Sequence, residues 1–132
     1  MEKKYTVLYI EDNQDNRVLV ERFLEFEGFT VYSAENGQMG LDKASELLPD
    51  VLLIDLNLPD ISGYEVVDIL NDRLETRDIP KIVFSASDIK QEHVPGVDFN
   101  YSFIQKPIDV NTLVERIKSA IQHSPDNPEP EH

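Results

Sequence analysis

The chain has 132 residues, which suits one domain of ordinary size, and a formal charge of −14 from 26 acidic and 12 basic residues. This charge argues against a protein that binds nucleic acid by neutralising phosphates, and against attraction to an anionic membrane. The absence of cysteine excludes disulfides, a cysteine nucleophile and thiolate metal sites. The longest apolar runs are only a few residues, so we expect no transmembrane helix, no signal peptide and a cytoplasmic location.

Apolar runs typical of buried strands alternate along the chain with helical apolar periods. Five strands are predicted, at Tyr5–Ile10, Phe29–Ala34, Val51–Ile54, Lys81–Phe84 and Tyr101–Ile104. Helices are predicted at Gln14–Glu27, after the N-cap Asn36, from Ser62 or Gly63 to about Arg73, in a short piece after Ser87, and at Asp109–Gln122. Residues 1–123 would form one domain. Residues 124–132, with three prolines and no apolar residue, would be a disordered acidic tail.

This alternation predicts a parallel sheet, in which the functional site lies at the carboxyl ends of the strands. Glu11 and Asp12 end the first strand and Asp55 ends the third, so a strand order of 2-1-3-4-5 would bring three carboxylates together. Such like charges repel unless one takes up a proton or a cation sits among them, and a set of oxygens with open positions suits Mg²⁺. For one acid alone, a solvated loop residue or a helix cap is the plain alternative.

A carboxylate beside Mg²⁺ can act as a nucleophile toward a phosphoryl group and form an aspartyl phosphate. Such a transfer chiefly needs positioning and charge neutralisation, which the metal and a lysine can supply. Ser85 and Lys106 follow the fourth and fifth predicted strands and would add a hydroxyl and a mobile cation. Taken alone, each is more often an ordinary surface or turn residue.

With these residues in place, the sequence resembles the receiver domains of two-component response regulators over residues 4–123. The motifs that carry the resemblance are VLYIEDNQDNR, DVLLIDLNLPDISGYE, IVFSAS and FIQKPI, with 30 residues from Asp55 to Ser85 and 21 from Ser85 to Lys106. The resemblance implies a flavodoxin-like (βα)5 fold, a three-layer sandwich around a five-stranded parallel sheet in the order 2-1-3-4-5. It also implies a stand-alone signalling protein that takes a phosphoryl group from a histidine kinase or phosphotransfer protein.

Residue by residue, the resemblance implies that Asp55 is the phospho-acceptor and that Ser85 and Lys106 hold the phosphoryl oxygens. The magnesium ligands that it implies are Asp55, Asp12 directly, Glu11 largely through water, and the backbone carbonyl of Asn57. The added negative charge would shift a two-state population that a downstream partner protein reads. Such a protein is no enzyme in the usual sense, because it only assists its own phosphorylation and dephosphorylation.

Three further features follow from the resemblance. Phe103 would be the aromatic residue that turns inward when Ser85 moves toward the phosphate, although a plain core residue is the alternative. The Lys106-Pro107 bond would be cis, and Gly63 would permit either close packing or a positive φ. Glu11 stands where the family commonly has aspartate, Ser85 stands where it commonly has threonine, and the stretch from residue 88 to residue 100 departs most from the family.

Several alternatives remain open at this point. A flavin carrier of the same fold is disfavoured, because the acidic loop after the first strand would repel phosphate. A hydrolase working through an aspartyl phosphate is disfavoured, because Asn57 stands where it would need an acid. A phosphorylation-independent interaction module and a receiver excised from a larger regulator or hybrid kinase are retained. For the oligomeric state we expect a monomer or a weak phosphorylation-dependent dimer.

Overall fold

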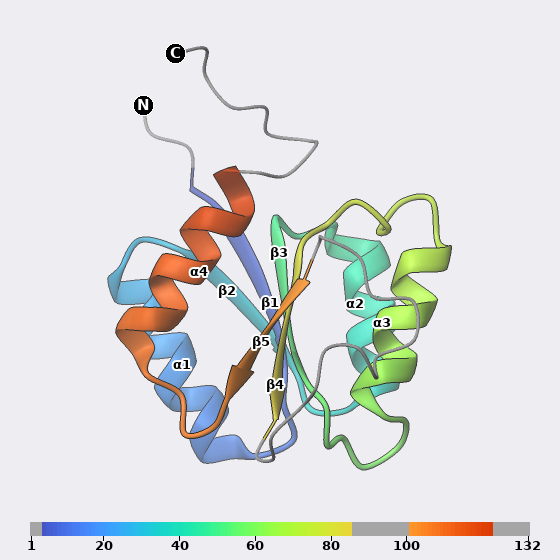
Figure 1. The fold of residues 1–132 in the computed structure, drawn as a ribbon, viewed down its shortest axis with the longest axis horizontal. Helices are drawn as coiled ribbons and strands as arrows, with labels where there is room; N and C mark the ends of the chain where they lie inside the picture. Colours follow the sequence, from blue (N-terminus) through green and yellow to red (C-terminus); the bar gives the residue numbers. More distant parts are fainter. Residues whose placement is uncertain (1–3, 86–100, 123–132) are drawn as a thin grey trace.

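A computed structural model describes residues 4–85 and 101–122 (Figure 1). The five strands are β1 (Thr6–Ile10), β2 (Thr30–Ala34), β3 (Val51–Asp55), β4 (Lys81–Ser85) and β5 (Tyr101–Gln105). The helices of this part are α1 (Gln14–Phe26), α2 (Gly37–Leu47), α3 (Gly63–Asp72) and α4 (Val110–Gln122). The short helix predicted after Ser87 and the acidic tail at residues 124–132 lie outside the described residues. No helix among the described residues is long and apolar enough to cross a membrane.

The strands form one parallel sheet in the order β2-β1-β3-β4-β5, which confirms the predicted topology. Helices α1 and α4 cover one face of the sheet, and α2 and α3 cover the other (Figure 1). The last three strands each continue one residue further than predicted, because Asp55 pairs with Phe84 and Ser85 pairs with Gln105. Asp55 and Ser85 are therefore the final residues of two adjacent strands, held by the ladder of the sheet.

The core lies in two layers, one on each side of the sheet. Val7 and Tyr9 of β1 pack into the layer under α1 and α4, whereas Leu8 and Ile10 pack into the layer under α2 and α3. This alternation follows from the twofold period of side chains along a strand. The central strand β3 is buried at every position, as expected where helices cover both faces of a parallel sheet.

Side-chain caps mark where the first three helices begin. Asn13, Asn36 and Ser62 each accept a hydrogen bond from the backbone N–H three residues later, which satisfies a donor that a helix start leaves free. Asp60, in the loop after β3, adds a second cap to α2 by accepting from the N–H groups of Gly37 at 2.7 Å and Gln38 at 2.9 Å. The loop that follows Asp55 is therefore tied to the start of α2.

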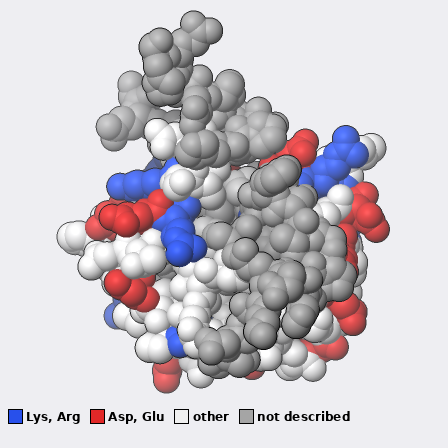
Figure 2. Space-filling model, viewed as in Figure 1, with Lys and Arg blue, Asp and Glu red and all other residues white. Residues whose placement is uncertain are grey.

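The acidic surface is broad. On the face shown in Figure 2, acidic side chains lie both over the side of α1 and α4 and over the side of α2 and α3. The excess negative charge is therefore spread over both helical layers and is not confined to the carboxylates at the strand ends.

Candidate functional site

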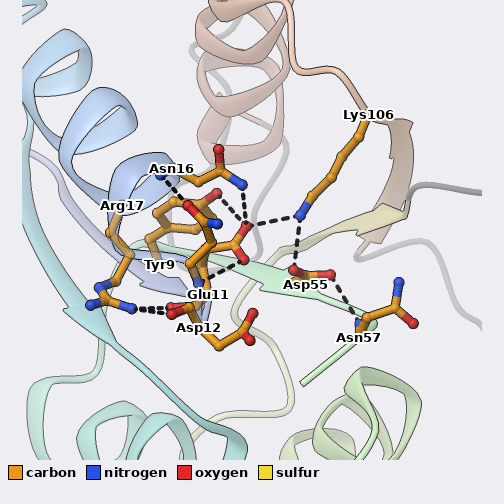
Figure 3. Close-up of polar contacts among 9 residues, drawn as sticks. Tyr9, Glu11, Asp12, Asn16, Arg17, Asp55, Asn57 and Lys106 are labelled. Carbon is orange, nitrogen blue, oxygen red and sulfur yellow. Dashed lines mark hydrogen bonds and ion pairs between the residues drawn. The ribbon is translucent and has the colours of Figure 1, made fainter. Parts of the chain in front are cut away.

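Three carboxylates meet at the carboxyl ends of β1 and β3, which are neighbours in the sheet (Figure 3). One oxygen from each of Glu11, Asp12 and Asp55 lies within 4.8 Å of the others. Glu11 and Asp55 are buried, at 1% and 2% exposure, and Asp12 is exposed. The structure thus brings together the acids that the strand order predicted would meet, with one of the three open to solvent.

Lys106 enters this cluster from the end of β5 (Figure 3). Its Nζ atom donates to Asp55 Oδ2 at 2.9 Å and to Glu11 Oε1 at 3.0 Å. The bond between Lys106 and Pro107 is cis, as the resemblance implied. One tethered cation therefore faces three carboxylates, and the cluster keeps an excess of negative charge.

The buried carboxyl of Asp55 holds protons more tightly than an ordinary aspartate. Burial, together with a hydrogen bond shared with Glu11, raises the pKa of Asp55 to about 6. The backbone N–H of Asn57, which donates to Asp55 Oδ1 at 2.9 Å, and the ammonium of Lys106 act in the opposite direction. A cation placed among the acids would compete with this proton and favour the ionised carboxylate.

The pKa of Glu11 is shifted in the opposite direction. Burial alone would raise the pKa of Glu11, but hydrogen bonds from Asp55 and from Lys106 outweigh it and lower that pKa. Of these two neighbouring buried carboxyls, Asp55 is therefore the one that binds a proton more readily, and Glu11 is the one that more readily keeps its negative charge.

The donor set fits a hard divalent cation. The three carboxylates offer only oxygen atoms, and one of them faces solvent, which is the combination that Mg²⁺ takes when it keeps several of its waters. Asn57, two residues after Asp55, is exposed, and its N–H donates to Asp55 Oδ1, so its backbone lies at the rim of the cluster.

Ser85 and Phe103 occupy the neighbouring strands. Ser85 ends β4 with 4% exposure, and its carbonyl accepts from the N–H of Lys106 at 2.8 Å, so both residues reach the same edge of the sheet. Phe103 lies on β5 opposite Val83 and packs, partly buried, against the core layer under α2 and α3. The structure places both residues at positions compatible with the implied roles.

Gly63 serves close packing at the start of α3. A Cβ atom on this residue would lie 2.5 Å from the carbonyl oxygen of Asp55 and 2.6 Å from the Cα atom of Leu56. Of the two reasons considered for this glycine, the structure supports the contact, which presses α3 against the strand end that carries Asp55.

Three residues near the acids escaped the sequence analysis. The hydroxyl of Tyr9 and the side-chain amide of Asn16 donate to Glu11, and the guanidinium of Arg17 donates to the carbonyls of Glu11 at 2.7 Å and Asp12 at 2.9 Å (Figure 3). One signal was available for Tyr9, since it stands two residues before Glu11, and side chains two residues apart along an extended backbone lie on the same face. Asn16 and Arg17 lie in the first turn of α1, and their orientation depends on how the helix packs.

Comparisons with known proteins agree with this arrangement. The model of the response regulator receiver domain family matches residues 7–118. The chain is 37% identical over 116 residues to the polar-differentiation response regulator DivK of Brucella anthropi, covering 86% of this chain and 94% of DivK. It is 32% identical over 121 residues to the response regulator ArlR of Staphylococcus epidermidis, covering 91% of this chain but only 54% of ArlR. The chain therefore spans about half the length of that relative.

A solved structure shows the same fold. The CheY-like response regulator receiver domain from Methylobacillus flagellatus matches with a TM-score of 0.78 and 28% identity, covering 89% of this chain and 99% of that one. The stretch matched by the family model contains the three acids, Ser85 and Lys106. The family model matches most of the chain, the chain is 37% identical to DivK, and its strands have the order of the receiver fold. The chain therefore belongs to the family of response regulator receiver domains.

Proposed function

We propose that this receiver domain accepts a phosphoryl group on Asp55, in a reaction that depends on Mg²⁺, and thereby changes its interaction with a partner protein. The observation that carries the proposal is the position of Asp55, whose carboxylate is buried, held at Oδ1 by Asn57 and contacted at Oδ2 by Lys106. Bound Mg²⁺ would neutralise charge on the transferring oxygens. The side chains of Glu11 and Asp12 and the carbonyl of Asn57 would hold it, together with Asp55.

In the transfer that we propose, Asp55 is the nucleophile, and Lys106 and Ser85 bind the phosphoryl oxygens. An ionised oxygen of Asp55 attacks the phosphorus of a phosphohistidine, the new P–O bond forms, and the P–N bond to the donor's imidazole breaks. Lys106 stands within hydrogen-bond distance of Asp55 Oδ2, so it is placed to pair with a phosphoryl oxygen at that position. Ser85, at the end of the adjacent strand, would donate its hydroxyl to another of these oxygens.

The switch that we propose uses Ser85 and Phe103. Movement of the Ser85 hydroxyl toward the phosphoryl group would vacate space beside β5, and the partly buried Phe103 would turn into it. A downstream protein would then bind the altered surface. The domain acts on no separate substrate and only assists its own phosphorylation and dephosphorylation. A cytoplasmic location, and a monomer or weak phosphorylation-dependent dimer, belong to this proposal.

A pocket beside Lys106 offers a place for the phosphodonor, which we propose is a histidine kinase or a phosphotransfer protein. It has a volume of about 480 Å³ and is lined by Asn16, Leu19 and Val20 of α1 and by Lys106, Pro107, Ile108 and Val110 of the other wall. Leu19 at its rim is 61% exposed. An apolar side chain of the donor packed here would bring the phosphohistidine close to the end of β5.

The test is to incubate the protein with a small-molecule phosphodonor and Mg²⁺ and to measure its intact mass. We expect an adduct of one phosphoryl group that is lost in Asp55→Asn and in the absence of Mg²⁺. An adduct that survives Asp55→Asn would contradict the proposal, and no adduct at all would favour a phosphorylation-independent interaction module.

A further inference from the structure

Tyr9 delivers a hydroxyl to the carboxylate cluster from inside the core (Figure 3). The residue is fully buried, and its hydroxyl donates to Glu11 Oε1 at 3.0 Å. The tyrosine ring packs edge-on against Phe84, with ring centroids 5.9 Å apart and an interplanar angle of 76°. Glu11 directly follows β1, and its N–H still pairs with the carbonyl of Ala34 at 2.9 Å. Tyr9 and Glu11 are two residues apart along this extended backbone, so their side chains leave the same face. The core therefore fixes where this hydroxyl lies.

The two oxygens of Glu11 are not used equally. Among the described residues, Oε1 accepts from the hydroxyl of Tyr9 at 3.0 Å, from Asn16 Nδ2 at 3.4 Å and from Lys106 Nζ at 3.0 Å. Oε2 accepts from the N–H of Asn13 at 3.3 Å. The three hydrogen bonds to Oε1 thus orient the carboxylate. A cation that displaces the proton shared by Glu11 and Asp55 frees an acceptor position on Glu11 for itself or for a water bound to it.

We propose that Tyr9 is a positioning residue for the divalent cation and that it acts through Glu11. It can do so because the glutamate side chain is long enough for its carboxylate to meet the hydroxyl of Tyr9. An aspartate at this position would be one carbon–carbon bond shorter, and its carboxylate would be withdrawn from the buried hydroxyl. The tyrosine in β1 and the glutamate that ends the strand would then work as a pair. This inference rests on the proposed cation site and deepens it.

A purely structural role is the competing explanation. A buried tyrosine hydroxyl needs a hydrogen-bond acceptor, and Glu11 would satisfy that need even if the cation gained nothing from it. The two explanations differ in what they predict for cation affinity, because only positioning makes that affinity depend on the hydroxyl.

The test measures binding of Mn²⁺, a cation that takes the same oxygen ligands as Mg²⁺, from the electron paramagnetic resonance signal of the free ion. We expect Tyr9→Phe to raise the dissociation constant by about tenfold, the lower end of the effect of losing a partner that orients a ligand. The matched control is Tyr32→Phe, because Tyr32 is 43% exposed on β2. This variant should bind like the unaltered protein. Circular dichroism under the same conditions must show every variant folded.

The decisive comparison repeats Tyr9→Phe in a Glu11→Asp background. There the hydroxyl no longer reaches the carboxylate, so we expect the second substitution to change the dissociation constant by less than about twofold, the level of uncoupled substitutions. An unchanged affinity in Tyr9→Phe, or an equal loss in both backgrounds, would overturn the inference even if the thermal midpoint fell. If the unaltered protein bound no Mn²⁺, or if Asp12→Asn left binding intact, the cation site itself would be wrong.

Discussion

Lys106 and Asp55 form an ion pair across 51 residues of sequence, with Nζ and Oδ2 2.9 Å apart. The same ammonium contacts Glu11 at 3.0 Å, so the lysine stands where a cation is needed among the acids. The strand order produces this contact, because β5 lies next to β4, and β4 next to the β3 strand that ends in Asp55.

Replacing this lysine should separate its effect on cation binding from its effect on phosphorylation. Lys106→Met removes a charge from two buried carboxylates, so we expect tighter binding of Mn²⁺ by a factor of several and much slower phosphorylation by a small-molecule donor. The loss of two charge-assisted hydrogen bonds should lower the free energy of unfolding in urea by roughly 1–3 kcal/mol. Lys118 on α4 is exposed, so Lys118→Met offers a matched control, which should change neither Mn²⁺ binding nor the rate of phosphorylation. Weaker cation binding in Lys106→Met would contradict this account of the charges.

The pKa of Asp55 can be measured directly. In the cation-free protein, carbon-13 NMR of the carboxyl groups should show Asp55 titrating at about 6. Glu11→Gln removes a like charge and replaces a charged hydrogen-bond acceptor by a neutral amide, which favours the protonated carboxyl less, so the pKa of Asp55 should fall. An Asp55 pKa that stays in place or rises in this variant would show that burial alone causes the shift.

The cap from Asp60 predicts a dependence of stability on pH. Burial alone would raise the pKa of Asp60, but hydrogen bonds from the backbone N–H groups of Gln38 and Gly37, joined by those of Ile61 and of Asp60 itself, together outweigh it and lower that pKa below its usual 3.8. Since the folded-state pKa is the lower one, the stabilisation is complete above the unfolded pKa and is lost as the pH falls through the folded value.

Asp60→Asn tests this directly. The thermal midpoint of the unaltered protein should exceed that of Asp60→Asn at neutral pH, and the gap should close as the pH drops below about 4. A gap that persists unchanged in strong acid would mean that Asp60 stabilises the protein by something other than its charge at the start of α2.

Gly63→Ala should disturb the acceptor loop through a steric contact. The added methyl would press on the backbone of Asp55 and Leu56, which we expect to cost roughly 1–3 kcal/mol of stability and to slow phosphorylation. Gly28→Ala is the comparison, because Gly28 has a φ of 100° and nothing within 4 Å of the added atom. It should destabilise through its backbone and leave phosphorylation unchanged, and equal slowing in both variants would refute the contact argument.

The sequence predicted those parts of the site whose position depends only on where the strands end and on their parallel order. Glu11, Asp12 and Asp55 follow apolar strands, and parallel strands bring their carboxyl ends to one edge whatever the side-chain packing. Local signals also placed the helix starts, since Asn36 and Ser62 cap through a backbone N–H three residues away. These features depend on short stretches of chain.

What sequence could not show depends on side-chain orientation and on contacts distant along the chain. Asp60 caps α2 across more than 20 residues, and nothing local marks it as a cap. Lys81 begins β4 yet is fully buried, because its Nζ donates to the carbonyls of Thr76, Arg77 and Ile79. The link from Tyr9 to Glu11 likewise required the ring to be placed by the core. In each case a polar group finds its partner only after the layers have packed.

The central claim is that Asp55 carries the phosphoryl group, and chemical trapping tests it most directly. Borohydride reduces an aspartyl phosphate to homoserine, so protein treated with a phosphodonor and Mg²⁺ can be reduced, digested and analysed by mass spectrometry. We expect homoserine at position 55, and only in samples that received the donor. Homoserine at another acidic residue, or none at position 55 despite a phosphoryl adduct in the intact mass, would contradict the claim.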